Sequence, residues 1–112
     1  MRYFKTGATR DTDEGKLDYE GFLHPLVIQR FAEYMNKHRT QADGKLRDSD
    51  NWQKGIPQDA YMKSAWRHFM DWWLEHRGLK SREGAEEAIC AVIFNAQGYL
   101  LELLRNKNDK GD

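Results

Sequence analysis

Three polar residues near the middle of the chain have the types and the spacing of divalent-metal ligands. His68, Asp71 and Glu75 stand at positions i, i+3 and i+7, so a helix would carry them on one face. Imidazole nitrogens and carboxylate oxygens are ligands for Mg²⁺, Mn²⁺ or Zn²⁺. The same face lies opposite Trp66 and Trp73, so it would also suit the solvated side of an amphipathic helix. The spacing predicts either a metal site or a polar surface.

Acidic residues also open the next predicted helix. Glu83, Glu86 and Glu87 lie near its first turn, where carboxylates stabilise the positive end of the helix dipole. Helical bundles also hold divalent metals with acids from facing helices. We assign Glu83 to dipole stabilisation, and both roles stay open for Glu86 and Glu87.

A second group of residues would suit an anionic, planar ligand. Lys54 and Arg67 could hold phosphates, and the indole of Trp52 could stack on a ring. The structural alternatives are a surface salt bridge for Arg67 and a core residue that fastens a loop for Trp52. Asn95 stands among apolar residues, where an amide without a hydrogen bond costs about 1–3 kcal/mol. It is either a satisfied amide between helices or a ligand contact.

Two helices are predicted before the acidic residues at 83–87, and the second of them would carry His68, Asp71 and Glu75. Pro25 suits the first turn of a helix from about Pro25 to Lys37, whose apolar stripe contains Leu23, Val27, Phe31 and Met35. A second helix spans about Pro57 to His76 and stops before Gly78. Its apolar face recurs with the helical period and consists of Met62, Ala65, Trp66, Phe69 and Trp73.

A third helix is predicted from Ser81 or Arg82, with Ser81 as its cap, to about Arg105. Residues 88–94 are apolar nearly all round, which is typical of a central helix or of an oligomer interface. Small or compact residues at 91, 95 and 98 permit close helix approach. The prediction is therefore an all-α fold: a small bundle of three main helices with a long polar loop, completed by homodimerisation.

The remaining segments show no periodicity. Residues 1–20 are polar and form a predicted loop around Gly7, Asp11, Asp13 and Gly15. Residues 38–56 form a long polar loop, and long loops of this kind are usually functional or disordered. Trp52 indicates that the end of this loop is docked. Residues 106–112 are a predicted frayed tail.

Size and composition bound the possible functions. The chain has 112 residues, which suits one domain over residues 1–112, and its formal net charge is zero, which disfavours nucleic-acid binding. The only cysteine, Cys90, excludes an internal disulfide and is predicted to be an inert core thiol. There is no apolar signal segment and no run of about 20 apolar residues. These features predict a cytoplasmic protein without a membrane segment.

Several stretches together resemble a bacteriophage family. They are residues 7–11 (GATRD), 15–19 (GKLDY), 50–57 (DNWQKGIP), 64–68 (SAWRH) and 87–95 (EAICAVIFN). They are similar to the N-terminal domain of dATP/dGTP diphosphohydrolases over roughly residues 7–104. The resemblance implies phage origin, the host cytoplasm, and hydrolysis of dATP or dGTP to a monophosphate and pyrophosphate with Mg²⁺ or Mn²⁺.

The resemblance to these diphosphohydrolases implies roles for individual residues. Asp71 and Glu87 would be catalytic, and the metal would be surrounded by His68, Asp71, Glu75 and Glu87. The nucleotide would be bound by Lys54, Arg67, Trp52, Tyr19 and Asn95, with the two cations on the phosphates and Trp52 or Tyr19 facing the base.

The carboxylate pattern supplies the main alternative. MazG-like all-α pyrophosphohydrolases carry Glu-x-x-Glu on one helix and Glu-x-x-Asp on the next. The matching positions here are His68-x-x-Asp71 and Glu87-x-x-Cys90. The alternative is therefore a non-catalytic phage protein that binds a nucleotide or nucleotide-like signal and sequesters it or regulates a partner. A third hypothesis, a helical adaptor that docks through the third helix, has no motif in its favour.

Overall fold

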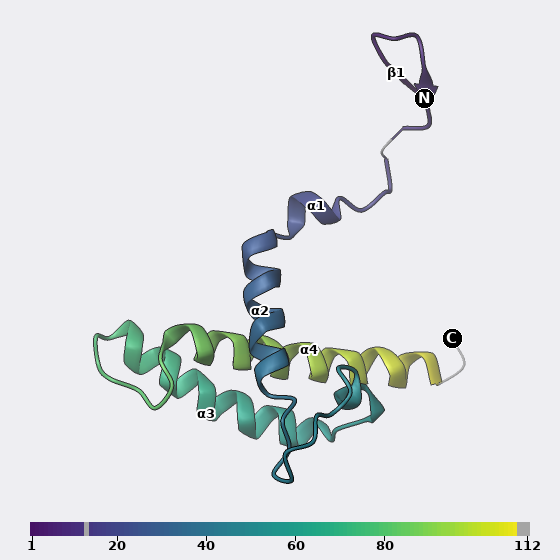
Figure 1. Cartoon of the computed structure of the whole chain (residues 1–112). Helices are drawn as coiled ribbons and strands as arrows, with labels where there is room; N and C mark the ends of the chain where they lie inside the picture. The colour runs from purple at the N-terminus through teal and green to yellow at the C-terminus, as the bar shows by residue number, and fades with distance from the viewer. Residues whose placement is uncertain (13, 110–112) are drawn as a thin grey trace.

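The computed structural model describes residues 1–12 and 14–109 and is mostly helical, as predicted. Helices α3 and α4 run side by side, α2 runs across them, and the chain before α2 extends away (Figure 1). The radius of gyration is therefore 19.2 Å, against about 13 Å for a compact domain of this length. The elements are β1 (Arg2–Tyr3), β2 (Thr9–Arg10), α1 (Tyr19–Phe22), α2 (Pro25–Lys37), the 3-10 helix η1 (Asn51–Lys54), α3 (Gln58–His76) and α4 (Ala85–Asp109).

The end of α3 is fixed by a glycine, as the sequence predicts. Gly78 has a φ of 77°, a left-handed conformation that side chains disfavour. Its N–H donates to the Glu75 carbonyl, and the N–H of Leu79 donates to the Leu74 carbonyl at 2.8 Å. These two bonds form a Schellman motif, which satisfies the last carbonyls of α3 and reverses the chain toward α4.

The start of α4 differs from the prediction. Ser81 does not cap the helix, which begins at Ala85. Instead the Ser81 hydroxyl accepts from the Gly84 N–H at 2.9 Å and donates to a Glu75 carboxylate oxygen at 3.1 Å. These bonds hold residues 81–84 in a turn, and Gly84 adopts a φ of 86° there. Glu83 therefore lies in a turn and not on a helix.

The core joins the second half of α2 to the middle of α4. Tyr34, Cys90 and Ala91 are buried, and they are flanked by Phe31, Met35 and Phe94. The burial of Cys90 confirms a core thiol, and it raises the pKa of the thiol, which disfavours the thiolate. Leu23 and Val27, at the other end of the predicted stripe, are exposed, because only the C-terminal half of α2 reaches this core.

Small residues on α4 allow the close approach of α3 that the sequence predicts. Ala91, Asn95 and Gly98 are buried. The ring of Tyr61 from α3 occupies the space that a Cβ on Gly98 would fill. Glycine at this position therefore sets how near the two helices lie.

The predicted apolar face of α3 is turned outward in the single chain. Trp66 is 63 % exposed, and Met62, Phe69 and Trp73 are also exposed. The polar face packs against α4 instead, and Asp71 is only 2 % exposed. The solvated-surface interpretation of this face is wrong for Asp71, because its charge finds a partner in the turn before α4.

Two segments predicted as loop contain short regular elements. Within residues 1–20, β1 and β2 pair antiparallel with Arg2 opposite Arg10, and α1 follows under an Asp18 cap. Strands of two residues are too short to show a period, so sequence patterns miss them. Asp13, part of the predicted loop, lies outside the described residues.

The long polar loop is folded back on itself. Thr40 pairs with Leu46 in an isolated bridge, and η1 follows it. Trp52 of η1 is half-buried with its ring edge-on to Phe94 at 5.8 Å, which confirms that the loop end is docked. At the chain end, the predicted frayed tail is helical through Asp109, and residues 110–112 lie outside the described residues.

Helix α4 has the length and apolar composition of a membrane span over Ala85–Lys107. The central helix of a soluble protein passes the same test, and α4 packs on both α2 and α3. The cytoplasmic location and the absence of a membrane segment stay predictions.

Candidate functional site

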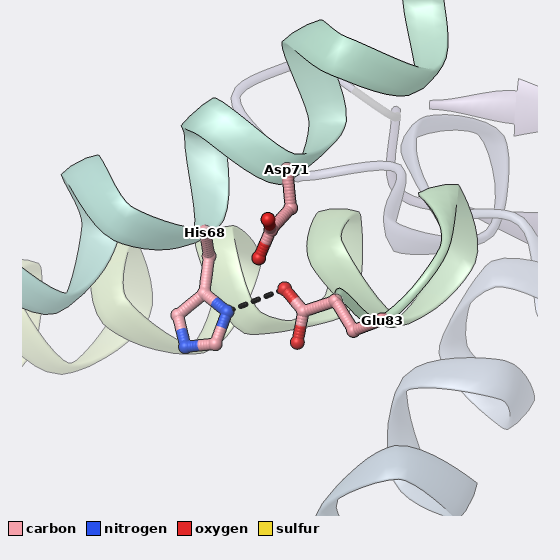
Figure 2. Close-up of side chains that lie close together, drawn as sticks. All are labelled: His68, Asp71 and Glu83. Carbon is pink, nitrogen blue, oxygen red and sulfur yellow. Dashed lines mark hydrogen bonds and ion pairs between the residues drawn. The ribbon is translucent and has the colours of Figure 1, made fainter. Parts of the chain in front are cut away.

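Three side chains with metal-ligating atoms converge where α3 meets the turn before α4. His68 and Asp71 come from successive turns of α3, and Glu83 reaches them from residues 81–84 (Figure 2). Each offers one ligand atom, and these atoms all lie within 4.8 Å of one another. Glu83 Oε1 is 2.6 Å from His68 Nδ1. We call these residues the His68–Asp71–Glu83 group.

Arg82 neutralises the buried acid of this group. Its Nε and Nη2 donate to the two oxygens of Asp71, the shortest contact being 2.6 Å. These hydrogen bonds hold the pKa of Asp71 below its ordinary value, against the opposing effect of burial. Asp71 is therefore a carboxylate at neutral pH.

The donor set fits a divalent cation that accepts both nitrogen and oxygen. One imidazole and two carboxylates suit Mn²⁺ better than Mg²⁺, which prefers oxygen alone. A cation here would compete with Arg82 for Asp71. The Arg82 side chain is 64 % exposed, so it has room to turn into solvent when a cation takes its place at Asp71.

A cavity of about 230 Å³ adjoins this group, and His68 lines it. Its wall combines basic, aromatic and amide side chains from the polar loop, α2, η1, α3 and α4. Within the described part of the chain, Asp48 is the one carboxylate among the lining residues, which are Tyr34, Met35, His38, Arg39, Arg47, Asp48, Ser49, Asn51, Trp52, Ser64, His68, Phe94 and Asn95.

The side chains of two arginines of the polar loop are fixed at the cavity by backbone carbonyls of the same segment. Arg39 Nε donates to the Arg47 carbonyl at 2.7 Å, and the Arg47 N–H donates to the Arg39 carbonyl at 2.8 Å. Arg47 Nη2 also donates to the His38 carbonyl. The loop therefore presents two positioned guanidinium groups, which suit a phosphate.

The predicted nucleotide-binding residues separate into two sets. Trp52 and Asn95 line the cavity, and Asn95 Nδ2 donates to Ser64 Oγ at 3.1 Å and to the Ala91 carbonyl at 2.8 Å. Lys54 and Arg67 are exposed and do not line it. Tyr19 is 67 % exposed on α1, in the segment that extends away from the helices.

Two of the predicted metal ligands lie elsewhere. Glu75 accepts from the Ser81 N–H and hydroxyl, so it holds the turn that carries Glu83. Glu87 pairs with Arg30 of α2 at 3.1 Å and with Lys37 at 3.4 Å. Although burial opposes the change, these cations lower the pKa of Glu87. Glu87 therefore fastens α2 to α4 in the single chain.

Sequence patterns do not mark Glu83, Arg39 or Arg47 as site residues. Glu83 lies in the turn of residues 81–84, which carries no periodic signal, and not in the first helical turn that the sequence predicts. The two arginines stand in a loop, where only their charge marks them. The chain matches no protein-family model, no curated protein and no solved structure.

Proposed function

We propose that this chain binds a nucleoside triphosphate and hydrolyses it with a divalent cation, releasing pyrophosphate. The observation that carries the proposal is that His68 belongs both to the His68–Asp71–Glu83 group and to the wall of the basic cavity. Phosphates bound in the cavity would lie beside the cation ligands. Positively charged groups and a cation near phosphates are what phosphoryl-group chemistry requires.

Each residue has a role in this proposal. Arg39 and Arg47 hold the phosphates, and the half-buried ring of Trp52 faces the base. His68, Asp71 and Glu83 hold Mn²⁺ or Mg²⁺, which when bound would offset negative charge on the phosphates. The cavity of about 230 Å³ is smaller than most sites for whole drug-sized ligands. It therefore suits the phosphate end of the nucleotide, with the base nearer its mouth.

The resemblance to dATP/dGTP diphosphohydrolases supplies the first substrates to test. Purified chain would be incubated with dATP, dGTP and the corresponding ribonucleotides in Mn²⁺ or Mg²⁺, and pyrophosphate release would be measured. We expect turnover that EDTA abolishes and that Asp71→Asn removes. Arg67→Gln is the matched control, because Arg67 is on the same helix but outside the cavity.

A second candidate function is nucleotide binding without hydrolysis. The observation in its favour is that the acids of the group already have cationic or hydrogen-bonding partners, Asp71 with Arg82 and Glu83 with His68. Thermal stabilisation by nucleotide in the presence of EDTA, without turnover in any metal, would select this candidate. A chain that shows no stabilisation by nucleotide and no turnover would reject both candidate functions.

A further inference from the structure

We infer that a second copy of this chain covers the exposed apolar face formed by α3 and α4. We call it the α3/α4 apolar face, and its large members are Met62, Trp66, Phe69, Trp73, Val92, Leu100 and Leu103. The inference is independent of the proposed function. It rests on the shape, chemistry and area of this face.

The face is continuous and carries no charge at its centre. Two shallow grooves of about 300 Å³ each run along it and share Met62, Ala65 and Val92. Among the residues that the structure describes, none that lines either groove is charged. Monomeric soluble proteins rarely expose apolar patches of this kind, and four half-exposed side chains on one helix need a partner surface.

The exposed area matches what a stable dimer needs. The six large residues other than Val92 are each about half exposed. Their exposed parts sum to roughly 700 Å², given the size of aromatic and aliphatic side chains. A standard interface buries roughly 800 Å² per partner, so this face and its rim suffice.

The geometry favours a second copy over an unrelated partner. Helices α3 and α4 form a two-helix layer that is half of a four-helix bundle (Figure 1). A two-fold axis through the face would pair this layer with itself, and an uncharged surface meets its own copy without repulsion. The formal net charge of zero also removes long-range repulsion between copies.

The experiment is the mass of the full chain in solution by light scattering after size exclusion, at several concentrations. We expect twice the 13.2 kDa of one chain. Trp66→Glu is expected to give the single-chain mass with its helical circular dichroism retained. Phe22→Glu is the matched control, because Phe22 is 79 % exposed but lies on α1, off the face. It is expected to leave the dimer intact.

Three results would overturn the inference. They are a wild-type chain of single mass at every concentration, a dimer that survives Trp66→Glu, or a dimer lost equally in Phe22→Glu. The last would mean that the N-terminal segment of another copy makes the contact. If Trp66→Glu does not fold, Leu100→Glu on α4 tests the same face. Trp fluorescence of the wild type on dilution gives a readout without any variant, since dissociation would expose Trp66 and Trp73.

Discussion

Glu83 and His68 are separated by 15 positions in the chain, yet their side chains lie 2.6 Å apart. The Schellman turn at Gly78 reverses the chain, and the turn of residues 81–84 aims Glu83 back at α3. The contact therefore depends on backbone geometry that neither helix supplies alone. The same backbone geometry makes Glu83 the acid that can share a cation with His68 and Asp71.

The first prediction concerns the ligands of that cation. His68→Ala and Glu83→Gln are each expected to weaken Mn²⁺ binding about 10- to 100-fold, because the first removes the nitrogen donor and the second removes the negative charge of a ligand. Titration calorimetry with Mn²⁺ alone measures this on the free protein. Glu87→Gln is the discriminating control, because the sequence pattern places Glu87 at the metal and the structure pairs it with Arg30. Weaker binding in Glu87→Gln, with Glu83→Gln unaffected, would favour the sequence-based ligand set.

The second prediction concerns the loop arginines. Arg39→Gln and Arg47→Gln should each weaken dATP binding about tenfold, the effect of losing one charge-assisted hydrogen bond. Competition or calorimetry in EDTA isolates this effect from the cation. Arg67→Gln should bind dATP as the wild type does, since its side chain does not line the cavity. Equal loss in all three variants would indicate a general effect of charge and not a positioned pair.

The sequence predicts α2 and α3 well because their signals are local. The bounds of α2 follow from Pro25 and an apolar period, and the end of α3 follows from Gly78. Which face of α3 points inward is not a local property. The apolar stripe and the buried polar face have opposite chemistry, and only the partners in residues 81–84 make burial of Asp71 tolerable.

The candidate site is predictable only in part for the same reason. His68 and Asp71 share a helix face, so their spacing reveals them. Glu83, Arg39 and Arg47 come from turns and loops, whose conformation is set by backbone hydrogen bonds over many residues. Only the resemblance points to Tyr19, which lies on α1, in the segment that extends away from the helices, and does not line the cavity.

The third prediction is a pH dependence of stability that comes from Asp71. Arg82 lowers the pKa of Asp71 in the folded chain below its ordinary value of 3.8. The folded state therefore binds fewer protons than the unfolded state below about pH 5. The contribution of the Asp71–Arg82 pair to the free energy of unfolding is complete above that pH and is lost as the pH falls. In Arg82→Gln the buried carboxylate has no cation, and its folded-state pKa rises.

Urea unfolding between about pH 3 and pH 7 tests this prediction, because these limits lie on either side of the ordinary pKa of a carboxyl group. Arg82→Gln should be less stable than the wild type at neutral pH, and the difference should shrink toward pH 3. Arg77→Gln is the control, because Arg77 is exposed just beyond the end of α3. A difference that stays constant across the pH range would show that Arg82 acts through packing and not through the Asp71 charge.

The fourth prediction concerns the contact between Gly98 and the ring of Tyr61. Replacing a helical glycine by alanine normally stabilises a protein by roughly 0.5–1 kcal/mol, because glycine loses more entropy on folding. At Gly98 the added Cβ would overlap the Tyr61 ring, which is only 2 % exposed. Overpacking of this kind costs about 1–3 kcal/mol. Gly98→Ala should therefore lower the urea concentration at the midpoint of unfolding without changing the slope of the free energy of unfolding against urea.

The double variant Gly98→Ala with Tyr61→Leu separates the entropic gain from the overlap, because removing the ring should recover much of the lost stability. An increase in stability in Gly98→Ala alone would mean that α3 and α4 are less closely packed than the structure has them.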